Sequence, residues 1–310
     1  MNWWDGAGRG EILFTWDLWY GCNYRCSYCW WEMDNLWGKL SQRHKILPPE
    51  AWAAVWGRIA DKYGEVRIDI LGGEPLKYPR ADELLRSLSR FHRLVVTTNL
   101  SMEASRFKEL LEGISPERVH FNASFHPQFA AIEDVIEKAL MLRSAGFGSL
   151  GILFVTWPPF LPKLAEYHAI FKKAGLGLSP MIFQGRYQGK NYPDDYTGEE
   201  RKLLDPFLLN VGVSKDSDVK YRLEKSRTFG KMCHSGRVYA NVKSDGSVFR
   251  CGSYDDRAPV PMGSIFDPAF KLFDSPRPCP YQRCMCLEFR YLDEIYGKED
   301  VAASVAEARS

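Results

Sequence analysis

The sequence lacks the features that mark membrane, secreted and nucleic-acid-binding proteins. Its 41 Lys and Arg residues are nearly balanced by 39 Asp and Glu residues, which leaves a net charge of +2 and no cationic excess of the kind that binds nucleic acid or a membrane surface. No apolar run approaches the roughly 20 residues that span a bilayer. The amino-terminal stretch has no basic segment followed by an apolar one, so no signal peptide is visible. We therefore expect no nucleic-acid partner, no membrane association and a cytoplasmic location.

The eight cysteines of the chain fall into two groups, one near each end. Since no secretion signal is present, metal-bound thiolates in a reducing compartment explain them better than disulfides. Cys22, Cys26 and Cys29 have the spacing CxxxCxxC and directly follow an apolar run. A [4Fe–4S] cluster is normally held by four thiolates, so three would leave one iron open to another ligand. A zinc site is the alternative, but its nearest fourth ligand, His44, lies in a polar stretch without ligand-like spacing.

Strand and helix patterns alternate along most of the chain. A chain of 310 residues that is 45% hydrophobic can form one large domain, or one domain with a small appendage. Alternating strands and helices are typical of a parallel sheet with right-handed crossovers, and six such units predict an α/β fold, a partial (β/α)6 TIM-like barrel. The strands are expected at 12–18, 66–71, 94–98, 119–124, 150–156 and 178–183, and the helices from 49 onward and at 81–91, 101–111, 132–145, 161–174 and 199–210.

The candidate site residues follow predicted strands. In such barrels the active site forms at the carboxyl ends of the strands, so the cysteine loop and the turn Gly72–Pro75 should share one face. The motif Cys22, Cys26 and Cys29 with Tyr28, together with Gly72-Gly73-Glu74-Pro75, resembles the radical S-adenosylmethionine (SAM) superfamily. That resemblance implies a [4Fe–4S] cluster on the three cysteines and SAM at its open iron. It further implies SAM contacts from Tyr28 to the adenine, from Gly72, Gly73, Glu74 and Pro75 to the methionyl amine, and from Asn99 and Ser124 to the ribose and carboxylate.

Other polar residues at strand ends are candidates for the substrate pocket. His126 follows the fourth strand and would face the barrel mouth, although a lone histidine is more often structural. Gln184 and Arg186 follow the sixth strand and could meet a polar substrate, or could lie in a surface loop. Asn99 and Ser124 have capping or turn roles as their alternatives. Ser101 is expected to cap the helix at 101–111.

The carboxyl-terminal cysteines predict a second metal centre. Strands at 237–242 and 248–250, joined by Asp245-Gly246, form a predicted hairpin that brings Cys233 and Cys251 together. This region resembles the Twitch and SPASM extensions of radical SAM enzymes, which implies a small β-hairpin domain at 231–290 with one auxiliary [4Fe–4S] cluster. A zinc site on the same hairpin is the alternative. The expected ligands are Cys233, Cys251, Cys284 and Cys286, with Cys279 as an alternative ligand.

The resemblance also implies an activity. A core barrel at 12–210, followed by the cluster domain and a helical tail at 291–310, would cleave SAM reductively and abstract a substrate hydrogen atom with the 5′-deoxyadenosyl radical. An auxiliary cluster suggests oxidoreductase-like chemistry, a net oxidation or rearrangement. Because Cys22 lies close to Met1, we expect no leader-peptide-binding domain, which favours a small-molecule substrate. The alternatives are a maturase that crosslinks or epimerises a ribosomal peptide, and a non-catalytic zinc-binding interaction module. An electron donor such as flavodoxin or ferredoxin is the expected partner.

Overall fold

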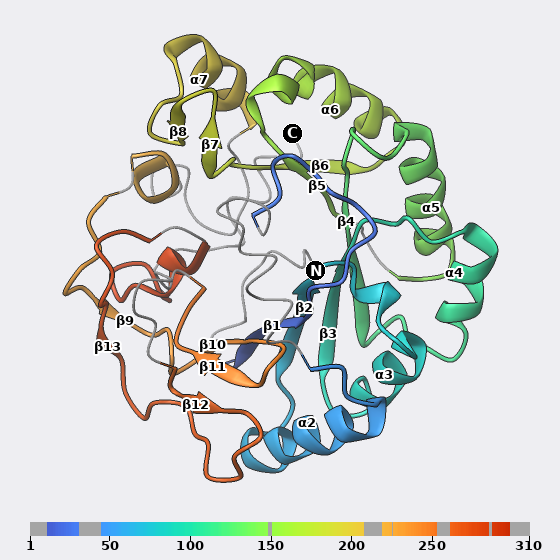
Figure 1. The fold of residues 1–310 in the computed structure, drawn as a ribbon, viewed down its shortest axis with the longest axis vertical. Helices are drawn as coiled ribbons and strands as arrows, with labels where there is room; N and C mark the ends of the chain where they lie inside the picture. The colour runs from blue at the N-terminus through green and yellow to red at the C-terminus, as the bar shows by residue number, and fades with distance from the viewer. Residues whose placement is uncertain are drawn as a thin grey trace.

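The protein is built on one nine-stranded sheet with helices along its outer side (Figure 1). The computed structural model describes residues 11–30, 45–147, 151–207, 219–224, 226–252, 261–284 and 287–297. Within these residues the strand order is β12-β11-β10-β1-β2-β3-β4-β5-β6. The sheet is therefore continuous from the carboxyl-terminal hairpin to the sixth strand.

Six parallel strands follow one another in chain order, and this confirms the predicted mixed α/β fold. Each pair of neighbouring strands is separated by a helix that packs on the outer face, as parallel pairing requires (Figure 1). The strands are β1 (Leu13–Trp19), β2 (Arg67–Gly72), β3 (Arg93–Thr98), β4 (Val119–Ser124), β5 (Gly151–Val155) and β6 (Gly177–Met181), and the helices are α2 (Pro49–Tyr63), α3 (Ala81–Leu88), α4 (Ala104–Leu111), α5 (Ile132–Ser144) and α6 (Leu164–Lys173).

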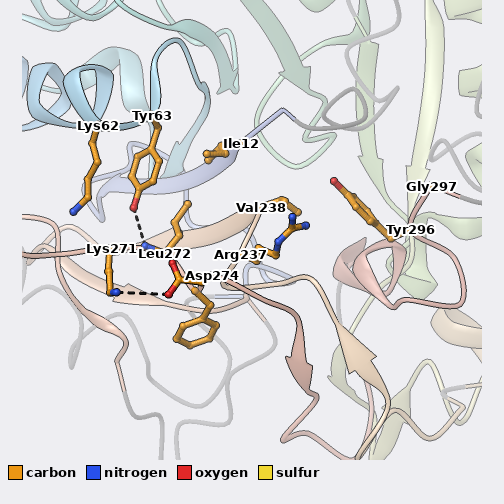
Figure 2. Close-up of a pocket in the computed structure, with 11 residues that line it drawn as sticks. Ile12, Lys62, Tyr63, Arg237, Val238, Lys271, Leu272, Asp274, Tyr296 and Gly297 are labelled. Carbon is orange, nitrogen blue, oxygen red and sulfur yellow. Dashed lines mark hydrogen bonds and ion pairs between the residues drawn. The ribbon is translucent and has the colours of Figure 1, made fainter.

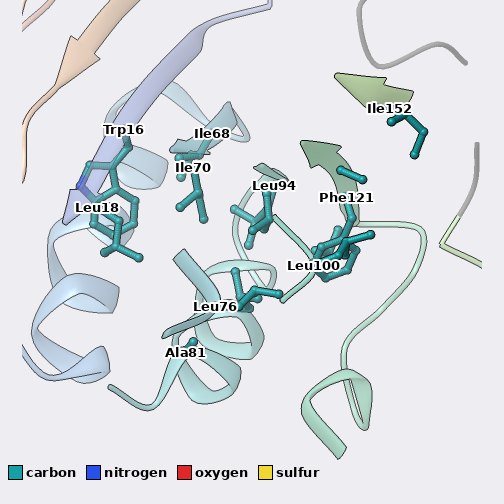
Figure 3. Close-up of a cluster of buried hydrophobic side chains, with 14 of the residues drawn as sticks. Trp16, Leu18, Ile68, Ile70, Leu76, Ala81, Leu94, Leu100, Phe121 and Ile152 are labelled. Atoms are coloured by element: carbon teal, nitrogen blue, oxygen red, sulfur yellow. The ribbon is translucent and has the colours of Figure 1, made fainter. Parts of the chain in front are cut away.

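The main hydrophobic core lies between the sheet and these helices (Figure 3). Side chains alternate between the two faces of a strand, so Trp16 of β1 and Ile68 and Ile70 of β2 point towards the helices. The ring of Trp16 lies 4.6 Å from that of Trp52 and 5.3 Å from that of Trp56, both on the predicted apolar face of α2. The opposite face of the same strands is left for the barrel interior.

Helix α4 begins later than predicted. Its first residue is Ala104 and its N-cap is Glu103, not Ser101. The hydroxyl of Ser101 instead donates a hydrogen bond to Oδ1 of Asn23 at 3.3 Å, and its backbone N–H donates to Oδ1 of Asn99 at 3.0 Å. The prediction of a Ser101 cap was wrong because a contact with the distant cysteine loop replaced the local one.

The last two predicted helices are also interrupted. A 3-10 turn, η3 (Pro158–Lys163), precedes α6, since Pro162 cannot donate a helical hydrogen bond. Helix α7 (Gly198–Leu204) is closed at its start by a capping box between Thr197 and Glu200 and continues as the 3-10 turn η4 (Asp205–Phe207). Residues 208–210 of the predicted helix lie outside the described residues.

The predicted hairpin forms, and it continues the main sheet. Strand β10 (Tyr239–Val242) pairs antiparallel with β11 (Ser247–Phe249), which in turn pairs with β12 (Gly263–Ser264). On its other edge β10 runs parallel to β1, with Leu13 opposite Tyr239. One sheet thus runs through both regions, and a separate hairpin domain stays a prediction.

Smaller elements complete the described chain. Strands β7 (Gly185–Tyr187) and β8 (Lys190–Tyr192) form a hairpin, and β9 (Met232–Cys233) pairs with β13 (Arg277–Pro278). Residues Val219–Leu223 form the π-helical turn η5, and Leu287–Tyr291 form the 3-10 turn η6. Most of the expected tail helix at 291–310 lies outside the described residues. None of the helices in the described ranges has the length and apolar character that crossing a membrane requires.

Candidate functional site

The three amino-terminal cysteines lie on the loop that leaves β1 at the carboxyl edge of the sheet. None of the three forms a disulfide; Cys26 is buried, and Cys22 and Cys29 are half-buried. Burial raises the pKa of Cys26 to about 12, and the charges of Cys29 and Cys22 add to this effect. Burial also raises the pKa of Cys22. A metal centre bound by these thiols would have to displace their protons, because the thiolate is the form that binds metal.

The donor set of this loop, three thiols, has the chemistry that an iron–sulfur cluster uses. In the described part of the chain, no three His, Cys, Asp or Glu side chains are grouped to hold one metal ion. The cysteines of a [4Fe–4S] cluster bind different irons, so they need not converge on one point as zinc ligands do. Two N–H groups also face the Cys22 sulfur, from the Tyr24 backbone at 3.4 Å and the Asn99 side chain at 3.9 Å. Such donors suit a thiolate.

The Gly72–Pro75 turn is hydrogen-bonded to the start of the cysteine loop. The backbone N–H of Gly73 donates to the carbonyl of Trp19, and that of Glu74 donates to the carbonyl of Gly21, each at 2.8 Å. Gly72 has a φ of +126°, which other residues rarely adopt. A Cβ on Gly73 would overlap the backbone carbonyl of Gly21. The two glycines therefore allow the turn and the loop to touch through their backbones.

Replacing Gly73 by alanine is expected to push the cysteine loop away from the turn. Overpacking of this kind costs about 1–3 kcal/mol of unfolding free energy, and the reconstituted iron content should fall with it. Gly57→Ala is the matched control: no atom lies within 4 Å of the added methyl group in α2, so this variant should gain about 0.5–1 kcal/mol. Urea unfolding and iron analysis of both variants test this, and equal stability of the two would contradict the role given to Gly73.

The Glu74 side chain joins the end of β2 to the end of β3. It is 2% exposed, and its carboxylate accepts hydrogen bonds from the Thr98 hydroxyl at 2.7 Å and from the backbone N–H of Asn99 at 2.7 Å and Leu76 at 3.0 Å. Burial raises the pKa of Glu74, and these donors oppose the rise. The carboxylate thus fixes the carboxyl ends of two strands, and its contact with a bound methionyl amine stays a prediction.

Asn99 and Ser124 lie at the ends of β3 and β4, on the same edge as the cysteine loop. The Asn99 amide donates to Oδ1 of Asn23 at 3.2 Å, in the loop itself. Ser124 is the last residue of β4 and is half-buried. The structure therefore ties Asn99 to the cysteine loop, while a contact between Ser124 and SAM remains a prediction.

His126 and Tyr28 are neighbours, although 98 residues separate them. Nδ1 of His126 lies 3.0 Å from the Tyr28 hydroxyl and 3.5 Å from the Cys26 sulfur. Desolvation lowers the pKa of His126 to about 4 and raises that of Tyr28. Tyr28 also packs against Trp157, with the ring centroids 5.6 Å apart. His126 is therefore a partner of the cysteine loop, which its sequence position did not reveal.

Gln184 and Arg186 are placed differently from His126. Gln184 is half-buried after β6. Arg186 is exposed on β7, and its Nε donates to Oδ1 of Asn191 across the β7–β8 hairpin at 3.2 Å. The next residue, Tyr187, packs on Trp157 at 5.1 Å. The hairpin thus reaches the aromatic group around Tyr28 through Tyr187, and a substrate contact of Arg186 remains a prediction.

The barrel interior contains polar residues that sequence analysis missed. Nζ of Lys243, just after β10, lies 2.6 Å from Oδ2 of Asp17 on β1, and both side chains are buried. Asn122 and Asn241 are buried on the faces of β4 and β10 opposite the helices, and among the described residues their Oδ1 atoms have no hydrogen-bond partner. Polar residues at alternate positions of otherwise apolar strands could have predicted these interior side chains. Such buried acceptors need a partner, which a bound molecule can supply.

Four of the carboxyl-terminal cysteines belong to a second buried cluster. Cys233, Cys251 and Cys284 are among its buried residues, and Cys279 is partly buried against the cluster. Strand pairing places Arg277 opposite Cys233, and the backbone N–H of Cys279 donates to the Lys231 carbonyl at 2.8 Å. Burial raises the pKa of Cys233, and Cys279 contributes to the shift. The structure thus brings the alternative ligand Cys279 to this group, whereas Cys286 lies outside the described residues.

A cavity of about 770 Å³ lies at the opposite, amino-terminal edge of the sheet (Figure 2). Ile12 and Val238, which line it, precede β1 and β10, so the cavity is separated from the cysteine loop by the length of these strands. Its charged lining residues are Lys62, Arg237, Lys271 and Asp274. We assign it no part in the chemistry of the cysteine loop.

These features define a parallel α/β barrel-like protein with a three-cysteine loop at the carboxyl edge of its sheet. Residues 16–156 match the family model of the Radical SAM superfamily, so this part of the chain is a Radical SAM domain, as the cysteine motif predicted. A protein of Methanocella arvoryzae named "Probable GTP 3′,8-cyclase" is 32% identical over 147 residues, which are 44% of this chain and 46% of that protein. The match thus spans less than half of this relative.

Two solved structures share the fold over most of the chain. SuiB of Streptococcus suis has a TM-score of 0.59 and 14% identity, and the match covers 93% of this chain and 67% of SuiB. Native anSMEcpe with bound AdoMet has a TM-score of 0.55 and 16% identity, with 82% of this chain and 78% of that one covered. At these identities the likeness establishes the fold, and the Twitch or SPASM assignment stays a prediction.

Proposed function

We propose that the protein is a radical SAM enzyme with its [4Fe–4S] cluster on Cys22, Cys26 and Cys29. The observation that carries this proposal is the three-thiol loop, hydrogen-bonded to the Gly72–Pro75 turn within a Radical SAM domain. When bound, the cluster supplies the electron that cleaves SAM into methionine and a 5′-deoxyadenosyl radical, which takes a hydrogen atom from the substrate. The protein positions both molecules and excludes water.

The chain's own residues have separate tasks in this proposal. Tyr28 contacts the adenine of SAM, and the Gly72–Pro75 backbone meets its amino group. Glu74 keeps that backbone in place through its bonds to the end of β3. Asn99 and Ser124 bind the ribose and carboxylate of SAM. Gln184 and Arg186 are candidates for substrate contacts.

We propose a polar small molecule as the substrate, in a net oxidation or rearrangement. The buried Asp17–Lys243 pair and the unpartnered acceptors of Asn122 and Asn241 support a ligand with polar groups. The second candidate is a ribosomal peptide, because SuiB, which shares the fold, has been solved with its precursor peptide SuiA. An electron-donor protein such as flavodoxin or ferredoxin completes the system. The described cysteines form no disulfide, which supports the proposal of a reducing, cytoplasmic location.

The test is an anaerobic assay for 5′-deoxyadenosine. The protein is reconstituted with iron and sulfide, reduced with dithionite and incubated with SAM. We expect cleavage of SAM and release of 5′-deoxyadenosine. Protein that binds zinc and retains no iron after reconstitution would contradict the proposal and favour the non-catalytic zinc-binding module.

We also propose an auxiliary [4Fe–4S] cluster on Cys233, Cys251, Cys279 and Cys284, with Cys286 as the competing fourth ligand. Cys233, Cys251 and Cys284 are buried in one cluster and Cys279 is partly buried against it, which supports this set. Cys279→Ala should lower the iron content by about four atoms per chain, while Cys286→Ala should leave it unchanged. Iron analysis after reconstitution checks both. The reverse outcome would assign the ligand to Cys286, and loss in neither variant would argue against a four-thiolate cluster here.

A further inference from the structure

The inference concerns the environment of the Cys26 sulfur and rests on the proposed cluster. His126 follows β4, yet its Nδ1 atom lies 3.5 Å from the Cys26 sulfur and 3.0 Å from the Tyr28 hydroxyl. The imidazole and the Tyr28 ring are nearly parallel, with an interplanar angle of 24° and centroids 5.9 Å apart. One histidine therefore contacts both a cysteine of the loop and the aromatic residue two positions later.

The segment that carries His126 is held on the cysteine loop by two further contacts. Gln128 and Ser27 exchange two hydrogen bonds of 2.9 Å: the Ser27 backbone N–H donates to Oε1 of the Gln128 side chain, and Nε2 of that side chain donates to the Ser27 hydroxyl. The ring of Phe129 stacks on that of Tyr24 at 4.8 Å. Residues 126–129 thus clamp the loop on both sides of Cys26, which limits the movement of the imidazole.

The position of the imidazole proton determines whether the Cys26 sulfur can accept a hydrogen bond at this contact. A thiolate has lone pairs and no proton, so it can only accept hydrogen bonds. With a proton on Nδ1, His126 can donate to the Cys26 sulfur directly, or to the Tyr28 oxygen while the Tyr28 hydroxyl donates to the sulfur. In both arrangements the sulfur receives a charge-assisted hydrogen bond. If the proton were on Nε2, Nδ1 would instead accept a hydrogen bond from the Tyr28 hydroxyl, and the Cys26 sulfur would receive no hydrogen bond from either side chain.

We propose that His126 is a positioning residue that, with Tyr28, supplies a hydrogen bond to the iron-bound sulfur of Cys26 and so raises the reduction potential of the cluster. Hydrogen bonds to cluster sulfurs are among the factors that set such potentials. The reduced cluster carries one more negative charge than the oxidised one, so a donor stabilises it more. A higher reduction potential makes the cluster easier to reduce.

The experiment compares cluster reduction in His126 variants without SAM. The ratio of reduced to oxidised cluster is read by electron paramagnetic resonance at one fixed electrode potential. His126→Phe keeps a ring beside Tyr28 but cannot donate, and we expect the ratio to fall about tenfold, which corresponds to about 59 mV for one electron. His126→Asn places an amide N–H near the Nδ1 position, and its ratio should stay within about twofold of the parent.

His168→Phe is the matched control. This half-buried histidine lies on α6 and packs against Phe207, so its variant should leave the ratio unchanged. An unchanged ratio in a fully iron-loaded His126→Phe protein would overturn the proposal. An equal fall in His126→Asn would also overturn it, because packing would then be the cause. If His126→Phe does not fold, His126→Leu takes its place. A parent protein without iron on the loop would instead refute the proposed function.

Discussion

Cys26→Ala is expected to abolish 5′-deoxyadenosine formation and to remove about four iron atoms per chain. Cys26 is the most enclosed of the three loop thiols, the one whose pKa burial raises to about 12. It is also the one contacted by His126. With it gone, Cys22 and Cys29 alone would have to hold the cluster, and two thiolates leave half of its irons without a protein ligand. Iron analysis and a chromatographic assay of 5′-deoxyadenosine measure the two effects.

Ser144→Ala is the matched control for this experiment. Ser144 is exposed at the end of α5, and its hydroxyl donates a hydrogen bond to the Met141 carbonyl in the same helix. Its loss should leave iron content and SAM cleavage close to those of the parent. Full iron content and unchanged activity in Cys26→Ala would show that the cluster is held elsewhere, and the proposed function would then have to be abandoned.

The second large effect is expected for Glu74→Ala, as a loss of stability. The substitution leaves the Thr98 hydroxyl and the N–H groups of Leu76 and Asn99 buried without their acceptor. An unsatisfied buried donor costs about 1–3 kcal/mol, so the three together predict a loss of at least about 3 kcal/mol in unfolding free energy. Urea denaturation measures this, and SAM cleavage should fall in the same variant because the ends of β2 and β3 separate.

Two further variants serve as comparisons for Glu74→Ala: one keeps the shape of the side chain without its charge, and one removes a carboxylate from the surface. Glu74→Gln keeps the shape and one acceptor oxygen, so its stability should lie between those of the parent and the alanine variant. Glu109→Ala removes an exposed carboxylate that pairs with Arg106, and surface pairs of this kind contribute little. If Glu74→Ala were as stable as Glu109→Ala, the three hydrogen bonds would not hold the strand ends.

The succession of six strands and their helices along the chain could be predicted from the sequence, because each element has its own local pattern of apolar residues. The apolar face of α2, with Trp52 and Trp56, follows from a period of 3.6 residues. The short spacing of Cys22, Cys26 and Cys29 and the strand that precedes them likewise predict a metal-binding loop at this place in the chain. These features depend on residues that are neighbours in the chain. The structure contains the predicted strands and helices, with small shifts at their ends.

Contacts between distant segments could not be read this way. The pairing of β10 with β1, the position of His126 beside Cys26, and the packing of Cys279 with Cys233 each join residues that no local pattern relates. Ser101 is another example, because its hydroxyl donates a hydrogen bond to the distant Asn23 and does not cap a helix. Local periodicity sets which segments become strands and helices. Which side chains then meet depends on how the sheet is ordered and on which loops lie at its carboxyl edge.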